Sequence, residues 1–230
     1  MKKVLFISLL ALSACSVSEG NFKSTVPVGT RVESPAQVLE ALPLAVNHDV
    51  PFFPQAPDAD WRLPWQETCE EASVVLAYYY AMDRDLTIDL FRQEILNLVS
   101  WQTVKLGDYK HTNAAQTARI LGEYYAFSDF EIVENPSVEQ LQRSLSQGSV
   151  IVAPFAGRML GNPFFRQPGP LYHMLVIKGY DQKHFITNDV GTRRGENFIY
   201  PYETLMSALH EWHDTTIELG AKKVIVVRPY

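Results

Sequence analysis

The 230-residue chain changes character near Gly148, and this change constrains its fold more than any other feature. Before that glycine, apolar residues recur mostly at spacings of three and four, which is typical of helices that bury one face. After it come short apolar runs separated by turn residues, which are typical of strands. Helices gathered early and strands gathered late predict one α+β domain, with N-terminal helices packed on a mostly antiparallel sheet.

The patterns predict five helices and five strands. The helices are expected at 69–82, 89–99 and 114–125, between Ser137 and Gly148, and at 202–212. The strands are expected at 130–133, 150–152, 172–178, 184–188 and 223–227. Two of the helix starts carry the spacing of a capping box, in Asn113 with Gln116 and in Ser137 with Gln140.

The start of the first helix holds the only cysteine of the globular part. Thr68 and Glu71 also have the spacing of a capping box, which places Cys69 at the first helical position. There the free N–H groups and the positive end of the helix dipole favour a thiolate, the nucleophilic form of cysteine. Glu67, Glu70 and Glu71 act in the opposite direction, because nearby negative charge raises the pKa of a thiol. Activation of Cys69 therefore requires a cationic partner, most plausibly a histidine.

The first residues of the chain resemble the export signal of a bacterial lipoprotein. Two lysines precede an apolar run at 4–12, which is shorter than the ~20 residues of a membrane-spanning helix. The run ends in Leu12-Ser13-Ala14-Cys15, which resembles a lipobox. We therefore expect a signal peptide at 1–14, a lipid on Cys15 and a location in the bacterial cell envelope, at the outer membrane if the host is Gram-negative. An ordinary signal peptide cut near Ala14 is the alternative.

If the chain is exported, expectations follow for its domains, for Cys69 and for its net charge. Residues 15–47 are expected to form a tether and residues 48–230 the folded domain. If Cys15 carries lipid, Cys69 has no intramolecular partner, and a lone thiol in an exported protein is either reactive or a liability. An inert buried thiol, or one that pairs with another chain, remains as an alternative. Loss of the two signal lysines leaves 18 basic against 26 acidic residues, a net charge of −8, which disfavours nucleic acid as a ligand.

A histidine and an aspartate are predicted to meet across a hairpin. The turn signal at 179–183 joins the strands expected at 172–178 and 184–188. If the turn is centred on Asp181, residues whose numbers add to 362 face each other, which places His173 opposite Asp189 at a Cβ separation of ~4.5–5.5 Å. A one-residue slip would exchange Asp189 for Asn188. An exposed cross-strand pair without a chemical role is the other alternative.

The remaining histidines are weaker candidates. His210 and His213 are spaced i, i+3 on an expected helix, which is a weak metal signal without an evident third ligand. A solvated helix end explains them better. His48, His111 and His184 are expected at the surface. No metal ion and no cofactor is predicted.

Four segments follow one another in a recognisable order. They are Val50-Pro51-Phe52-Phe53-Pro54-Gln55, Cys69-Glu70-Glu71-Ala72-Ser73, His173-Met174-Leu175-Val176-Ile177-Lys178-Gly179-Tyr180-Asp181 and Asn188-Asp189. Taken together, they resemble the peptidase C39-like family of the papain-like hydrolases. The resemblance covers roughly Val50 to the C-terminus and is to stand-alone domains. It implies a papain-like fold in which Cys69 is the nucleophile, His173 the general base and then acid, and Asp189 the residue that orients His173.

The same resemblance implies a glutamine that binds the oxyanion. Papain-like sites usually carry it six residues before the cysteine, where this chain has Leu63. We assign the role to Gln55, with Gln66 as the competitor; a hole formed by the Cys69 N–H and another donor is the third possibility. A second departure is Glu70, because the family commonly has glycine directly after the cysteine.

The function expected from these features is that of a secreted, lipid-anchored cysteine peptidase that hydrolyses peptide amide bonds with Cys69, His173 and Asp189. Its substrate is a peptide or protein, it contacts the membrane only through its lipid, and it acts as a monomer. One alternative is a catalytically degenerate papain-like binding module. Another is an acyltransferase or amidase that uses the same three residues.

Overall fold

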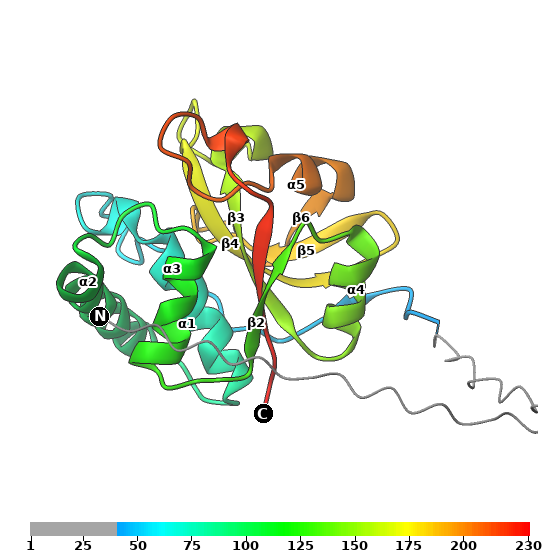
Figure 1. Ribbon diagram of the computed structural model, residues 1–230, viewed down its shortest axis with the longest axis horizontal. Helices are drawn as coiled ribbons and strands as arrows, with labels where there is room; N and C mark the ends of the chain where they lie inside the picture. The colour runs from blue at the N-terminus through cyan, green and yellow to red at the C-terminus, as the bar shows by residue number, and fades with distance from the viewer. Residues whose placement is uncertain (1–40) are drawn as a thin grey trace, which may run out of the picture. The chain divides into compact units, whose positions relative to one another are not determined.

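Seven antiparallel strands form one sheet in the computed structural model, which describes residues 41–230 (Figure 1). Six strands follow the order β2-β7-β3-β4-β5-β6, and β1 pairs with β4. Their bounds are Val46–Asn47 (β1), Phe130–Glu134 (β2), Val150–Ala156 (β3), Tyr172–Tyr180 (β4), His184–Asn188 (β5), Phe198–Pro201 (β6) and Lys223–Val227 (β7). The five predicted strands are confirmed, and β1 and β6 are additional to the prediction.

Five α-helices accompany the sheet. They are α1 (Cys69–Ala81), α2 (Ile88–Leu106), α3 (Ala114–Arg119), α4 (Val138–Ser146) and α5 (Tyr202–Ala208). In Figure 1, α1, α2 and α3 lie on one side of the sheet, and α4 and α5 lie on the other. The predicted α+β architecture is therefore confirmed. Within residues 41–230, no helix has both the length and the apolar character needed to cross a bilayer.

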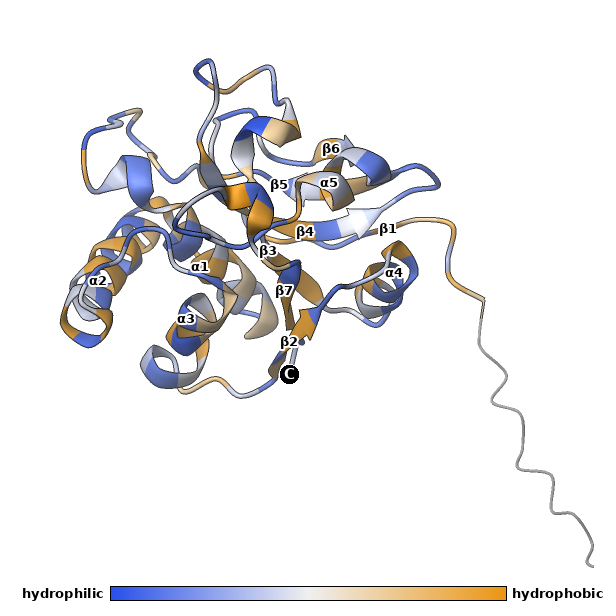
Figure 2. Ribbon diagram, turned by 45° about the horizontal axis from the view of Figure 1, so that its top comes forward, coloured by the Kyte–Doolittle hydropathy of each residue, from blue (hydrophilic) through white to orange (hydrophobic). Residues whose placement is uncertain are grey.

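The central strands of the sheet are buried on both faces, so the sheet separates two hydrophobic cores. Side chains of β4 alternate between them: Met174 and Val176 pack with α1 in the first core, and Leu175 and Ile177 pack with α4 and α5 in the second. Every residue of β4 is buried. Figure 2 shows the hydrophobic colour concentrated in the central strands, such as β3 and β7, between the helices.

Two of the three predicted capping boxes are confirmed and one is wrong. The boxes at Asn113 and at Ser137 form as expected, with both reciprocal hydrogen bonds present. Thr68 caps nothing with its side chain: its hydroxyl donates backward to the Trp65 carbonyl oxygen at 3.1 Å. Glu71 is turned into the core instead of back toward Thr68, and the Gln102 amide of α2 donates to it. Tertiary packing therefore overrides the local pattern at the start of α1.

Helix ends differ from the prediction where the chain makes other contacts. The second helix continues to Leu106, where Gly107 ends it with a φ of +89°. The third changes to a π-helical turn at Ile120–Tyr124. The last helix ends at Ala208, four residues before the predicted end, because Leu209 is extended and pairs with Phe155 of β3.

The segment at 50–55, which precedes α1, is hydrogen-bonded to the last residue of β5 and to the turn that follows it. The Asn188 side-chain amide donates to the carbonyl oxygens of Val50 and Pro51, at 3.1 and 3.2 Å. The backbone N–H of Gln55 donates to the Val190 carbonyl oxygen at 2.8 Å. Because β1 begins at Val46, the folded domain starts before His48, and the last residues of the predicted tether belong to the sheet. The predicted signal peptide, Cys15 and most of the tether lie outside the described residues.

We predict that Asn188→Ala destabilises the domain and loosens the 50–55 segment. The substitution leaves two backbone carbonyl groups without their donor, which costs about 1–3 kcal/mol in the free energy of unfolding. Urea unfolding measures this loss. The control is Gln93→Ala, which removes an exposed amide on α2 and changes the free energy by less than about 0.5 kcal/mol. Equal stability of the two variants would contradict the anchoring role.

Candidate active site

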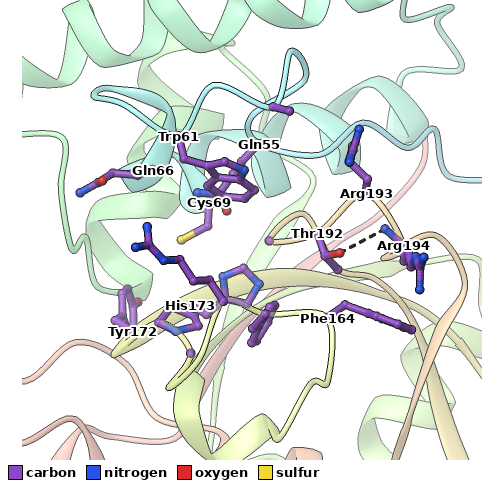
Figure 3. Close-up of a pocket in the computed structure, with 16 residues that line it drawn as sticks. Gln55, Trp61, Gln66, Cys69, Phe164, Tyr172, His173, Thr192, Arg193 and Arg194 are labelled. Atoms are coloured by element: carbon purple, nitrogen blue, oxygen red, sulfur yellow. Dashed lines mark hydrogen bonds between the residues drawn. The ribbon is translucent and has the colours of Figure 1, made fainter.

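A cleft of about 940 Å³ opens at the end of the sheet where α1 begins (Figure 3). Its walls come from the lead-in to α1, the first residue of α1, the loop at 157–170, the start of β4, and the turn at 191–194. Three sequence-predicted site residues line it, Gln55, Cys69 and His173. Asp189 lies beneath the surface, fully buried behind His173. The structure therefore gathers the four residues that the sequence assigned to one site.

Cys69 is the first residue of α1, as predicted, and its thiol is nearly buried. It is the only cysteine of the described part of the chain and is not in a disulfide. The thiol donates to Glu70 Oε2 at 3.0 Å. Burial and, after it, the negative charge and hydrogen bond of Glu70 raise the pKa of the Cys69 thiol well above its ordinary value. A hydrogen bond from the Met174 backbone acts in the opposite direction but is outweighed.

Glu70 is a buried carboxyl group in direct contact with this thiol. One oxygen meets the sulfur atom, and the other accepts the Thr112 backbone N–H at 3.2 Å. Burial raises the pKa of Glu70 to about 7, although the hydrogen bond from Cys69 and the charge of His173 partly oppose the shift. Glu70 therefore changes charge near neutral pH, within contact of the sulfur atom.

Glu71 is a second buried acid on the same turn of α1. Burial, followed by repulsion from Glu70, raises the pKa of Glu71 well above its ordinary value. The Gln102 amide donates to one of its oxygens, and its Oε2 has no hydrogen-bond partner among the described residues. No lysine or arginine of residues 41–230 pairs with either acid. Burial without a positively charged partner therefore favours the neutral form of the Glu71 side chain.

His173 contacts Asp189, but the predicted hairpin register is wrong. Next to the turn Tyr180 faces Phe185, so the turn is not centred on Asp181 and the facing numbers add to 365 instead of 362. A bulge between Ile177 and Gly179 then shifts the register, and Val176 faces Asn188. β5 ends at Asn188, and Asp189 belongs to a tight turn in which its N–H donates to the Gly195 carbonyl oxygen. This turn brings Asp189 Oδ1 to 2.8 Å from His173 Nε2. Asn188, the alternative partner, points to the other side and anchors the 50–55 segment.

Four hydrogen bonds hold the Asp189 carboxylate. Oδ1 accepts from His173 Nε2 and from the Gly191 N–H, and Oδ2 accepts from the Tyr200 hydroxyl at 2.6 Å and the Asn162 amide at 2.9 Å. Burial alone would raise the pKa of Asp189, but the His173 charge and these hydrogen bonds outweigh it and lower the pKa. Asp189 is therefore a carboxylate fixed in one orientation, and it fixes His173 in turn.

Sequence reasoning missed Asn162 and Tyr200. Asn162 lies in the proline- and glycine-rich loop at 157–170, where no regular pattern indicates a role for a single residue. Tyr200 lies in β6, a strand the sequence pattern did not reveal. From the same loop, the Phe165 ring packs edge-on against His173 with its centroid 5.3 Å away.

The two candidate glutamines differ in how they are held. Gln55 is buried, lines the cleft and donates one amide hydrogen to the Trp65 carbonyl oxygen at 2.9 Å. The other hydrogen of that amide is available for a further acceptor. Gln66 also lines the cleft, but it is exposed and its amide donates to Glu67 at 2.8 Å. The geometry favours Gln55 as the preorganised donor.

Gly191 is required where the turn passes the His173 ring. A Cβ atom at this position would lie 2.9 Å from both His173 Cε1 and Phe165 Cε1. We predict that Gly191→Ala displaces the imidazole and lowers turnover about 10²-fold, the scale expected from a misplacement of about 1 Å. The measurement is kcat/KM together with a circular dichroism spectrum.

The matched control is Gly122→Ala. Its added Cβ atom would approach its nearest neighbour, Phe130, only to 3.6 Å, which is ordinary contact. This variant should keep full activity. Equal activity of the two alanine variants would contradict the requirement for close approach at Gly191.

The comparison with family models identifies one family. The model of the Peptidase_C39 like family matches residues 47–216. No curated protein matches the chain. A crystal structure of a protein from Bacillus anthracis, described as a C39-like peptidase, superposes with a TM-score of 0.52 at 17% identity, over 80% of this chain and 98% of that one.

The crystal structure of xylellain, a cysteine protease from Xylella fastidiosa, gives a TM-score of 0.39 at 14% identity, over 83% of this chain and 87% of that one, which is too distant for any argument. The Bacillus anthracis structure supports the fold alone, whereas the family match spans most of the chain. Together with the order of the cleft residues, that match shows that the chain belongs to the Peptidase_C39 like family.

Proposed function

We propose that the protein is a cysteine peptidase that hydrolyses peptide amide bonds with Cys69, His173 and Asp189. The observation that carries the proposal is the pairing of His173 with a buried, fourfold hydrogen-bonded Asp189, in a cleft that Cys69 also lines. An imidazole oriented by a carboxylate beside a thiol at a helix start is the arrangement that nucleophilic acyl transfer requires.

The geometry supports a division of roles between the two imidazole nitrogens. Nε2 of His173 is engaged by Asp189, so Nδ1 is the nitrogen free to exchange a proton with the thiol. The Cys69 thiolate attacks the substrate carbonyl carbon, and His173 then protonates the departing amine. Water, deprotonated by His173, breaks the thioester and regenerates the thiol. The oxyanion formed in each step accepts hydrogen bonds from the Cys69 N–H and the Gln55 amide.

The N-terminal features support a further part of the proposal, an envelope location. Export and lipidation of Cys15 would tether the peptidase to the membrane by its lipid alone and expose it to peptides outside the cytoplasm. Mass spectrometry of the mature chain tests this. A diacylglyceryl group on an N-terminal Cys15 is the expected result, and an unmodified chain beginning after Ala14 would contradict it.

The central test is the reactivity of Cys69 toward iodoacetamide and the cleavage of a peptide library near neutral pH. We predict that Cys69→Ala abolishes cleavage and that His173→Ala lowers it about 10²–10⁴-fold, the usual contribution of general acid–base catalysis. His184→Ala is the matched control, because His184 also pairs with an aspartate, Asp181, but at the surface. It should retain full activity.

The same experiment distinguishes the alternative of a binding module. The acidic neighbour of Cys69 and its raised thiol pKa favour that alternative. If Cys69 reacts no faster than a free thiol and His173→Ala changes neither reactivity nor cleavage, the peptidase proposal fails. Added amine nucleophiles distinguish hydrolysis from acyl transfer, because only transfer yields their amides.

We also predict different outcomes for the two glutamines. Gln55→Ala should lower kcat by about 10²–10³ with little change in KM, because its amide would act on the oxyanion and not on the ground state. Gln66→Ala should leave kcat within about twofold. A loss at Gln66 in place of Gln55 would reverse the assignment.

A further prediction concerns Glu70 and pH. Below about pH 7 Glu70 is neutral, and above it the carboxylate opposes formation of the thiolate. Glu70→Gln removes that charge, so the pH midpoint of iodoacetamide alkylation of Cys69 should fall. Glu67→Gln is the matched control, because it removes a charge nearby without a hydrogen bond to the thiol. An equal fall in both variants would contradict a direct role for the Glu70 contact.

Stability gives a second measurement of the same group. The native state binds the Glu70 proton more tightly than the unfolded state, whose carboxyl has its ordinary pKa of 4.5. The free energy of unfolding should therefore decrease as pH rises from about 4.5 through 7. Glu70→Gln should flatten this decrease in urea unfolding, and an unchanged slope would contradict the raised pKa.

A further inference from the structure

The rim of the cleft carries only positive charge. Among its lining residues are three arginines, Arg166, Arg193 and Arg194, and no aspartate or glutamate. The chain as a whole has the opposite balance, with 26 acidic and 20 basic residues. Glu70 lies beneath the floor and is buried. Positive charge is therefore concentrated at the one place where a substrate must enter.

These three arginines have no carboxylate partner among residues 41–230. Five other arginines in that part of the chain each lie within 4.0 Å of a carboxylate; they are Arg62, Arg92, Arg119, Arg143 and Arg228. The three at the cleft are exposed, and the guanidinium group of Arg194 is held over the Phe164 ring at 4.9 Å. Their charges are thus available to a bound ligand.

The arginines belong to the two segments that hold His173, which are the loop at 157–170 and the turn after β5. Arg166 follows Phe165, whose ring packs against the imidazole. Arg193 and Arg194 lie in the turn that begins at Asp189 and closes on it through Gly195. In Figure 3, Thr192 accepts the Arg194 backbone N–H, which fixes this arm of the turn beside the cleft. Because Cys69 lines the same cleft, a carboxylate bound here would belong to a peptide that lies in the cleft beside that residue.

We propose that Arg166, Arg193 and Arg194 form a carboxylate-binding subsite, so that the preferred substrates are acidic peptides. The carboxylate comes from an Asp or Glu side chain near the scissile bond or from the C-terminus of the peptide. Guanidinium groups match carboxylates in shape and can bind them through paired hydrogen bonds. This inference rests on the proposed peptidase function for its readout of cleavage, but the subsite itself requires only binding.

The first experiment measures binding without cleavage. The full chain carrying Cys69→Ala is immobilised and incubated with a random decapeptide library, half with a free C-terminal carboxylate and half amidated. We expect enrichment of Asp and Glu, or of the free-acid peptides, which identifies the source of the carboxylate. The enrichment should weaken from 50 to 500 mM salt, because exposed charge pairs are screened.

The second experiment measures cleavage of matched peptides that differ only in Glu against Gln, or in a terminal acid against an amide. The double variant Arg193→Gln/Arg194→Gln and the single variant Arg166→Gln should lower the acid-to-neutral ratio of kcat/KM by up to about fivefold per arginine. Arg193→Glu/Arg194→Glu should invert the preference. Arg84→Gln is the control, because Arg84 is exposed outside the cleft and packs on Tyr79.

The two experiments test the subsite and the peptidase function separately. Enrichment of acidic peptides without any cleavage would overturn the peptidase and support the subsite. Cleavage without a carboxylate preference, or with a ratio that the arginine variants do not change, would overturn the subsite alone. If the library shows no enrichment and no peptide is cleaved, both the subsite and the peptidase function are overturned.

Discussion

The buried Asp189 carboxylate is the interaction on which the rest of the site depends. A charged group without solvent is stable only when hydrogen bonds replace the lost water, and this one accepts four. The donors come from β4 (His173), the turn after β5 (Gly191), the loop at 157–170 (Asn162) and β6 (Tyr200). One carboxylate therefore joins four separate segments. Loss of any donor would loosen the segments and the imidazole together.

The Cys69 thiol, which we propose as the nucleophile, contacts a buried acid on its own helix and shares the cleft with the His173–Asp189 pair. On its own helix, Glu70 raises the thiol pKa, and Glu71 lies buried behind it. On the other side, the Asp189 carboxylate fixes the orientation of His173, which in the proposed mechanism takes the thiol proton. In that mechanism a charged Glu70 would oppose formation of the thiolate, and a neutral Glu70 would remove this opposition. The glycine that is common at this position in the family has no side chain that could act in this way.

Helices and strands are predicted well from the sequence, because their signals are local. Contacts between distant residues are predicted poorly, because they depend on strand register and tertiary packing. The strand at 184–188 and the capping boxes at Asn113 and Ser137 follow from local patterns and were placed correctly. The predicted hairpin register was wrong because the turn is centred between Gln182 and Lys183 and not on Asp181, and the bulge in β4 then shifts the register once more; His173 and Asp189 still meet through a turn. The Thr68 box failed because Glu71 accepts a hydrogen bond from Gln102 of α2 instead. Asn162 and Tyr200 were missed because one lies in an irregular loop and the other in a strand that the sequence pattern did not show.

The proposed recognition surface and the proposed catalytic residues share two segments of the chain. The loop at 157–170 supplies Asn162 to Asp189 and Phe165 to His173, and it also carries Arg166 to the rim. The turn after β5 does the same with its own arginines. A shift of the backbone in either segment would therefore move the imidazole as well, whereas replacement of an exposed arginine side chain alone would change the rim and leave these contacts in place. The opposite wall, which carries Gln55, is held by a hydrogen bond from the Gln55 N–H to the Val190 carbonyl oxygen and by one from the Gln55 amide to Trp65. Because Val190 lies in the same turn as Gly191, a shift of that turn would reach this wall as well, and the proposed oxyanion donor would move together with the imidazole.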